Sequence, residues 1–305
     1  MSALDPAASS PLALDARATL GAARRSVAVR DRLFVALLLV LTSIGLIVLA
    51  ALLIDTGIDG FPKISADFLT SFPSAFPAKA GIESALVGTL WLMAVVAAVI
   101  VPLGVATALY LEEYADHLKW WNRVVEVNIQ NLAAVPSIVY GILGLAFIVR
   151  GPLGLGRTVL AGGLTLSLVV LPVVIVTARE AIRAVPPSIK EGALALGCTQ
   201  WQAIWKQLLP ASIPGIATGV ILSLSRAIGE TAPLILVGAA TFVAFNPTGL
   251  DSAFTALPLQ IFSWISQPKE EFQALAAAAI VVLLVVLIML NAVAIWLRNR
   301  YQKRW

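Results

Sequence analysis

Residues 158–178 read TVLAGGLTLSLVVLPVVIVTA, and residues 179–210, which follow directly, read REAIRAVPPSIKEGALALGCTQWQAIWKQLLP. The first stretch has 21 residues and no charged side chain. A helix needs about 20 apolar residues to cross the roughly 30 Å of hydrocarbon in a bilayer. The second stretch is more polar and contains proline and glycine. Together they predict a membrane-spanning helix followed by a structured loop.

Comparable apolar runs recur on both sides of this segment. They cover residues 33–54, 85–109, about 132–149, a run that starts near Ala211, and 274–297. Charged residues make up only 12% of the 305, whereas soluble proteins carry roughly 25%. The composition predicts an all-α membrane protein with about six transmembrane helices. The short loops leave no room for a separate soluble domain.

The basic residues are divided unequally between the two sides that six spans would define. Residues 1–32, 112–130, 179–210 and 298–305 would share one side, and they hold fifteen of the 21 Lys and Arg residues. The opposite side holds five. Because basic loops remain in the cytoplasm, both termini are predicted to be cytoplasmic. Residues 1–32 are rich in Ala, Ser and Arg and are predicted to be disordered.

The stretch 211–245 is too long for one straight span. It is either a single crossing followed by an interfacial or re-entrant segment, or two short crossings. A seventh span would place the basic C-terminal tail outside, so the charge distribution favours six.

The loop 179–210 predicts a compact helical protrusion. Pro186 and Pro187 would break the first helix, and Ser188 would open a second, amphipathic helix in a capping box with Glu191. Gly197 would end this second helix in the left-handed conformation. An ordinary interfacial loop is the plainer alternative.

The same loop resembles the "EAA" loop of bacterial ABC importer permeases. Residues Glu191, Ala193, Gly197, Leu209 and Pro210 match the family pattern, which is Glu-Ala-Ala-x3-Gly, nine residues, then Ile-x-Leu-Pro. Gly192 and Gln207 depart from it mildly. The resemblance implies a MetI-like ABC importer permease fold, in which this loop and its Lys190 form the coupling helix that docks into an ATPase subunit.

Further motifs resemble phosphate importer permeases. They are Leu-Glu-Glu-Tyr-Ala at 111–115 and Arg-Ala-Ile-Gly-Glu-Thr-Ala-Pro-Leu at 226–234, and they resemble the PstA type more than the PstC type. The similarity covers about residues 80–297. The resulting division is a first transmembrane helix at 33–54, a periplasmic or extracellular loop at 55–84, a permease domain at 85–297 and a basic tail at 298–305.

This resemblance implies a set of partners in a bacterial cytoplasmic membrane. They are a PstC-like second permease, two PstB-like ATP-binding subunits and a PstS-like external phosphate-binding protein. ATP and magnesium would be bound by the ATPase subunit, so this chain would hold no cofactor and would not be an enzyme by itself. The outer loop, with three Phe-Pro pairs, would contact the delivery protein or form an interfacial aromatic belt.

Arg226 and Glu230 lie four residues apart in an apolar stretch, so on a helix they share a face. Charges inside a membrane usually serve a function, and arginine suits forked contacts with an oxyanion. One interpretation is a gate formed by Arg226, Glu230 and Thr231. The other is a structural salt bridge that takes no part in transport.

Small residues recur every four positions on the same span, at Gly215, Gly219 and Ser223. This spacing lets two helices approach closely. The partner helix is expected either in the second permease subunit or within this chain.

Three other features carry no site. Residues 151–158 imitate a phosphate-binding P-loop, but a P-loop follows a strand and this stretch lies between spans, so it predicts a tight outer turn. Cys198 has no second cysteine to pair with, and His117 is the only histidine, so no metal spacing exists. The alternatives to phosphate import are a permease for sulfate or molybdate, or an ATPase-independent secondary transporter or channel.

Overall fold

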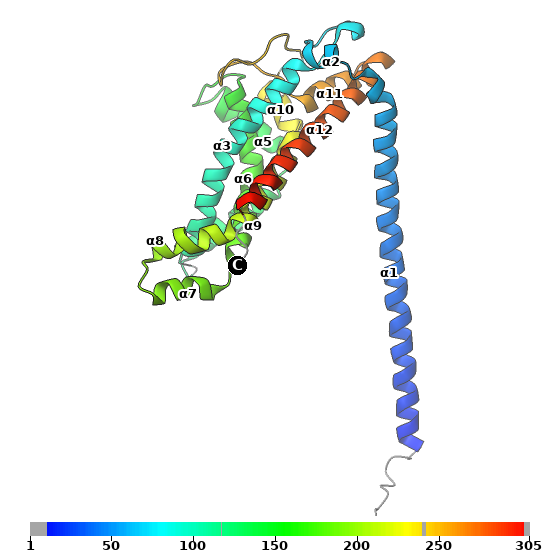
Figure 1. The fold of residues 1–305 in the computed structure, drawn as a ribbon, viewed down its shortest axis with the longest axis vertical. Helices are drawn as coiled ribbons and strands as arrows, with labels where there is room; N and C mark the ends of the chain where they lie inside the picture. Colours follow the sequence, from blue (N-terminus) through cyan, green and yellow to red (C-terminus); the bar gives the residue numbers. More distant parts are fainter. Residues whose placement is uncertain (1–10, 117, 240–241, 302–305) are drawn as a thin grey trace, which may run out of the picture. The chain divides into compact units, whose positions relative to one another are not determined.

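The computed structural model of the chain describes residues 11–116, 118–239 and 242–301. Every regular element among these residues is a helix and none is a strand (Figure 1), which confirms the all-α class. The chain divides into two compact units, Met1–Asp55 and Thr56–Trp305.

The elements follow one another through both units. In chain order they are α1 (Pro11–Gly60), η2 (Phe61–Lys63), α2 (Ala66–Thr70), η3 (Pro77–Lys79), α3 (Glu83–Glu113), α4 (Trp120–Ala133), α5 (Ser137–Leu143), η4 (Gly144–Val149), α6 (Val159–Arg183), α7 (Pro187–Ala195), α8 (Gln200–Ala203), η5 (Ile204–Leu208), α9 (Leu209–Gly229), α10 (Ala232–Val237), α11 (Leu257–Ile265) and α12 (Glu270–Tyr301).

Helix α1 is much longer than the span predicted at 33–54, because it begins at Pro11 and ends at Gly60. The structure thus draws residues 11–32, part of the segment predicted to be disordered, as helix, and residues 1–10 lie outside the described part. Residues 12–32 are rich in Ala, Leu and Arg, which are strong helix formers, so this segment continues the apolar helix that follows.

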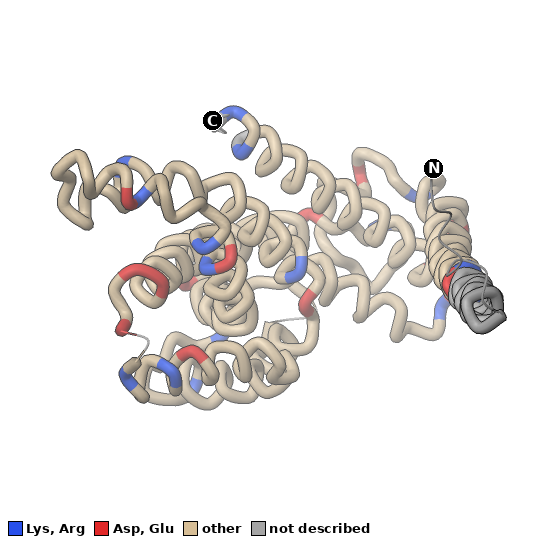
Figure 2. The backbone as a smooth tube through the Cα atoms, turned by 90° about the horizontal axis from the view of Figure 1, so that it is seen from below, with Lys and Arg blue, Asp and Glu red and all other residues tan. Residues whose placement is uncertain are grey.

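Five helices are long and apolar enough to cross a membrane, and the total is six if the bent pair α4–α5 counts as one span. Four of the five lie in the second unit, where long stretches of the helices carry no charged residue (Figure 2). They are α3, α6, the run Gln200–Gly229, and α12 up to Arg300. These findings confirm the prediction of about six transmembrane helices.

The third predicted span, at 132–149, is not a straight helix. Helix α4 ends at Ala133, α5 begins at Ser137, and the chain bends by 106° between them. Pro136 explains the break, since proline donates no N–H and pushes the preceding residue out of the helical conformation. Only residues 137–149 of the predicted span are helical beyond this bend.

The stretch 211–245 contains one long helix, α9, followed by the short helix α10. Glu230 leaves the helical conformation, and α10 starts again at Ala232 with Pro233 in its first turn. Gly238 ends α10 with a φ of 87°. This arrangement corresponds to a single crossing followed by a short segment, the first of the two alternatives.

Helix α6 is the most deeply buried span of the second unit, with 67% of its apolar window buried. Helices α3, α4 and α9 pack around it. Close approach requires small residues, because a Cβ atom at Gly163 would lie 2.4 Å from Cγ1 of Val95 on α3. Helix α6 therefore fixes the positions of its neighbours.

Candidate functional site

Helices α7 and α8 project together from one end of the second unit (Figure 1). They follow α6 and precede α9, so the predicted helical protrusion at 179–210 is present. Helix α8, the π-helical η5 and α9 run on as one span from Gln200 to Gly229. The protrusion is therefore joined by short connections to α6 and α9, the two spans that flank it in the chain.

The predicted capping box at Ser188 and Glu191 is absent. Helix α7 begins at Pro187 and its N-cap, Pro186, makes no side-chain cap bond. A proline needs no N–H acceptor in the first turn and its φ suits a helix, so it starts the helix without a polar cap. A capping box forms instead at α8, between Thr199 and Gln202.

Gly197 ends α7 as predicted, with a φ of 84°. The N–H of Cys198 donates to the carbonyl of Ala193 at 3.1 Å, and the N–H of Gly197 donates to that of Leu194 at 2.9 Å. These two bonds form a Schellman motif. The turn after α7 therefore has a defined shape that a residue with a side chain would strain.

The protrusion presents large apolar side chains to solvent. Leu196 is 87% exposed, and Leu194, Trp201 and Trp205 are exposed as well. Glu191 is also exposed, whereas Ala193 is buried against the protrusion itself. Exposed apolar side chains that lie together are typical of a protein contact surface.

Leu209 and Pro210, the last residues of the predicted motif, are half-buried at the start of α9. Pro210 has no N–H for the carbonyl of Lys206, and the five residues before Leu209 are π-helical. A π-helical turn is a common way to accommodate such an irregularity at a functional site.

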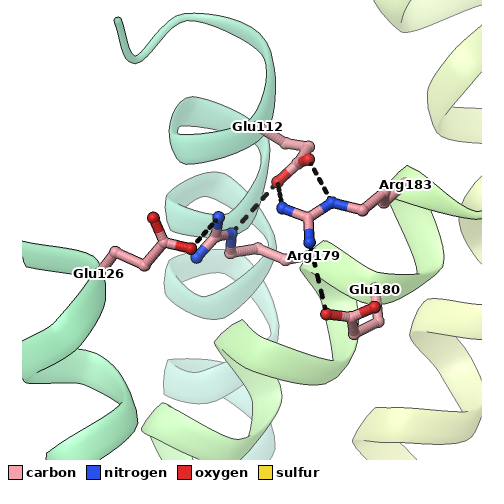
Figure 3. Close-up of polar contacts among 5 residues, drawn as sticks. All are labelled: Glu112, Glu126, Arg179, Glu180 and Arg183. Carbon is pink, nitrogen blue, oxygen red and sulfur yellow. Dashed lines mark hydrogen bonds and ion pairs between the residues drawn. The ribbon is translucent and has the colours of Figure 1, made fainter. Parts of the chain in front are cut away.

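Arg179, near the end of α6, bridges two other helices (Figure 3). Its Nε donates to Glu112 Oε2 on α3 at 3.2 Å, and its Nη2 donates to Glu126 Oε1 on α4 at 2.9 Å. The Arg179 side chain is only 7% exposed. Removing one partner from a buried ion pair costs about 3–5 kcal/mol, so this bridge holds the three helices α3, α4 and α6 together.

Arg183, one turn further along α6, binds the same carboxylate. Its Nε and Nη2 donate to the two oxygens of Glu112 at 2.8 and 3.1 Å, and its Nη1 lies 3.8 Å from Glu180 Oε1 (Figure 3). Such forked pairs are geometrically specific. Arg183 is half exposed, so it adds orientation more than stability.

The neighbouring Glu113 attaches α3 to the protrusion. Lys190 Nζ of α7 donates to the Glu113 carboxylate, and Gln200 Nε2 of α8 donates to the Glu113 main-chain carbonyl at 2.8 Å. The Glu113 side chain is 8% exposed. Glu112 thus joins α3 to α6, and Glu113 joins α3 to α7 and α8. We call the ion pairs of Glu112, Glu113, Glu126, Arg179, Arg183 and Lys190 the anchor network.

The sequence analysis did not predict the anchor network, although it used most of the residues that form it. Glu112 and Glu113 served only as part of a family motif, and Arg179 and Arg183 only as signs of orientation. The sequence did contain a signal for it. Arg179 and Arg183 are spaced (i, i+4) at the end of one predicted span, and Glu112 and Glu113 follow another predicted span on the same side of the membrane.

Arg226 and Glu230 do pair, with Arg226 Nε 3.3 Å from Glu230 Oε1. Arg226 is in the last turn of α9, 48% exposed, and Glu230 is the C-cap of the same helix. The hydroxyl of Thr231 lies 3.5 Å from the carbonyl of Gly229. The three predicted gate residues therefore lie together where α9 breaks before α10.

Gly215 and Gly219 face α6 of the same chain. A Cβ atom would lie 2.6 Å from Ala181 Cβ at Gly215 and 2.2 Å from Thr177 Oγ1 at Gly219. Ser223, one turn further, is buried. The small-residue face thus serves packing within this subunit, which was one of the two alternatives.

The P-loop imitation at 151–158 is a turn between η4 and α6, with positive φ at Gly154 and Gly156, as predicted. The residues that the structure describes contain no cluster of His, Cys, Asp and Glu that would hold a metal ion. His117 lies outside them.

Comparison with known proteins assigns the chain to a family. The family described as "Binding-protein-dependent transport system inner membrane component" matches residues 100–305. The probable ABC transporter permease protein YqgI of Bacillus subtilis is 35% identical over 205 residues, which cover 67% of this chain and 69% of YqgI. The phosphate transport system permease protein PstA of Xylella fastidiosa is 34% identical over 248 residues, covering 79% of this chain and 83% of that protein.

The fold also has a counterpart among solved structures. A chain of the bacterial alginate ABC transporter, solved in complex with its alginate pentasaccharide-bound periplasmic protein, superposes with a TM-score of 0.65 at 20% identity. The match covers 90% of this chain and 96% of that one. The predicted ABC importer permease fold is confirmed, and the chain belongs to the inner membrane component family of binding-protein-dependent transport systems.

Proposed function

We propose that this chain is the PstA-type permease subunit of an ATP-driven importer of inorganic phosphate and forms half of its translocation pathway. The proposal of phosphate rests on the similarity to proteins named PstA and on the Arg-Ala-Ile-Gly-Glu-Thr segment at 226–231. The observation that carries the coupling role is the rigid protrusion of α7 and α8, fastened to α3 and α6 by the anchor network.

The exposed side of the protrusion receives the ATPase subunit. Leu196 and Trp201 provide apolar contact area, and Glu191 offers a charge at the rim of this surface. Gly197 allows close backbone approach, the buried Ala193 packs within the protrusion, and Lys190 holds the helix to α3. Movement of the ATPase then reaches α9 through Leu209 and Pro210, which continue the same helical run.

The remaining subunits follow from this role. A PstC-like permease completes the pathway, two PstB-like subunits bind ATP and magnesium, and a PstS-like protein delivers phosphate from outside. The permease itself makes and breaks no covalent bond. The excess of Lys and Arg on one side supports our proposal that the protrusion and both termini are cytoplasmic.

Arg226, with Glu230 and Thr231, forms a transient anion gate. Its guanidinium is half exposed and has a forked donor geometry suited to an oxyanion. Glu230 would repel phosphate if it were left alone, so it serves as the partner that Arg226 returns to after the anion has passed. A binding site with this arrangement is weak, as passage through a transporter requires.

The test is ATP-dependent uptake in vesicles that contain this chain with its candidate partner subunits. We expect uptake of phosphate in preference to sulfate, lost in Arg226→Gln and kept in Arg300→Gln, an exposed arginine of α12. Preference for sulfate would remove the phosphate assignment and keep the fold. Unchanged phosphate uptake in Arg226→Gln, with the complex assembled, would reduce the Arg226 pair to a structural role.

A further inference from the structure

A groove of about 340 Å³ lies between α3, α9 and α12 in the second unit. Its lining is mostly apolar and includes Met93, Leu224, Ile228, Leu290 and Val293. All three helices qualify as membrane spans, so the groove lies within the hydrocarbon region of the bilayer. An apolar groove of this size needs an apolar occupant, because the side chains that line an empty groove would lose their van der Waals contacts.

Two polar contacts fasten α9 to α12 along the seam beside the groove. Ser225 Oγ donates to Asn291 Oδ1 at 2.6 Å, and both residues line the groove. Arg298 Nη1 donates to Thr218 Oγ1 at 3.0 Å. Thr218 precedes Ser225 by seven residues on α9, and Arg298 follows Asn291 by seven residues on α12. Because the two helices run antiparallel, both contacts lie along the same helix–helix interface, two turns apart.

The guanidinium of Arg298 therefore lies at one end of the groove. Its three hydrogen bonds go to neutral oxygens, which are Thr218 Oγ1 and Asn299 Oδ1 twice, at 3.0, 3.3 and 3.2 Å. Among the residues that the structure describes, no carboxylate pairs with this positive charge. Trp296, 64% exposed, accompanies it on α12. A tryptophan and an arginine at one level are typical of a membrane interface.

We propose that an anionic phospholipid binds here, with one acyl chain in the groove and its phosphate on Arg298. From Arg298 to Leu290 the helix rises by about 12 Å, which matches the depth of an acyl chain in one leaflet of a roughly 30 Å hydrocarbon layer. By the charge asymmetry this is the cytoplasmic leaflet, which carries the anionic lipids. The lipid joins α9, the helix of Arg226, to α3 and α12. The inference does not depend on the transported substrate.

The test is native mass spectrometry of the assembled complex, taken from vesicles of equal phosphatidylglycerol and phosphatidylethanolamine. We expect a retained phosphatidylglycerol for each copy of this chain. Ala294→Trp, which fills the groove, removes it, whereas Ile288→Trp, on an exposed position of α12 outside the groove, does not. Equal retention in the two variants would overturn the proposal.

Arg298→Gln separates the headgroup from the acyl chain and does not require a filled groove. We expect a lipid to remain, with the ratio of phosphatidylglycerol to phosphatidylethanolamine lowered about fivefold, the equivalent of ~1 kcal/mol for one cation at the surface. Arg300→Gln, two residues on and about 200° round the helix, leaves the ratio unchanged. An unchanged ratio in Arg298→Gln would refute the headgroup contact.

A cross-linking measurement identifies the occupant without altering the groove's charge. A benzophenone side chain at Leu90, an exposed lining residue, is expected to attach to one phospholipid on illumination. Attachment to a helix of another subunit would show that protein fills the groove and would overturn the proposal.

Discussion

The anchor network and the Arg226 pair are both arginine–glutamate systems, but they are held very differently. Arg179 connects three helices, is almost fully buried and has two carboxylate partners. Arg226 pairs with Glu230 one turn away in the same segment and is half exposed. The first arrangement constrains tertiary structure, whereas the second constrains almost nothing beyond its own helix end.

This difference separates the part that we propose transmits force from the part that we propose changes partner. A buried pair is costly to break because the remaining charge has no solvent. An exposed (i, i+4) pair contributes only a few tenths of a kcal/mol, so an incoming anion can compete with it. We therefore expect the ion pairs of the proposed coupling path to stay intact during transport, and the ion pair of the proposed gate to open readily.

The largest effect is expected for Arg179→Met, which keeps the length of the side chain and removes its charge. Glu126 then loses its partner and Glu112 keeps only Arg183, so we expect a loss of about 3–5 kcal/mol of stability. The thermal unfolding midpoint of the purified complex measures it. Arg183→Met is the control, because Arg183 is half exposed and should cost about 1 kcal/mol or less. Equal losses would contradict the distinction.

Gly219→Ala tests whether α9 is held to α6 by steric fit instead of charge. The added Cβ would lie 2.2 Å from Thr177 Oγ1, so overpacking should cost about 1–3 kcal/mol. Gly229→Ala on the same helix meets no atom within 4 Å and should change stability by no more than about 1 kcal/mol. The same melting experiment checks both, and a neutral Gly219→Ala would refute the close contact.

Lys190→Met detaches α7 from the buried Glu113 and should cost roughly 1–2 kcal/mol. Its more specific effect is on coupling, since ATP hydrolysis should continue while phosphate transported per ATP falls. Lys206→Met, an exposed lysine of the same loop, is the matched control. The exchanged pair Lys190→Glu with Glu113→Lys should recover part of the coupling. A normal transport ratio in Lys190→Met would show that this contact transmits nothing.

Arg226→Gln should have the smallest effect on stability, about 0.5 kcal/mol or less, because Arg226 is half exposed and its partner lies at the end of the same helix. Phosphate uptake should nevertheless be lost. This combination of nearly unchanged stability and lost uptake distinguishes Arg226 from Arg179. The melting temperature and the phosphate uptake are measured on the same preparation. A large drop in the melting temperature would place Arg226 with the structural ion pairs.

Several local features were predictable because their causes are local. The apolar runs predicted the spans, and Gly197 predicted the left-handed end of α7, since only glycine adopts that conformation without strain. The prediction for the start of α7 was wrong for an equally local reason, because the helix begins at Pro187 and Ser188 does not cap it. The bend at Pro136 was signalled by that proline, but residues 132–149 alone do not reveal a 106° change in direction.

The sequence by itself determined the all-α class, the approximate number of spans, the expected orientation and the helical protrusion at 179–210, because hydrophobicity, charge and turn chemistry act over short distances along the chain. Only the tertiary structure decided that Glu112 and Glu113 face different partners, that Gly219 packs on α6, and that an apolar groove lies between α3, α9 and α12. These contacts join residues more than 40 positions apart, and their energy comes from burial that no local pattern records.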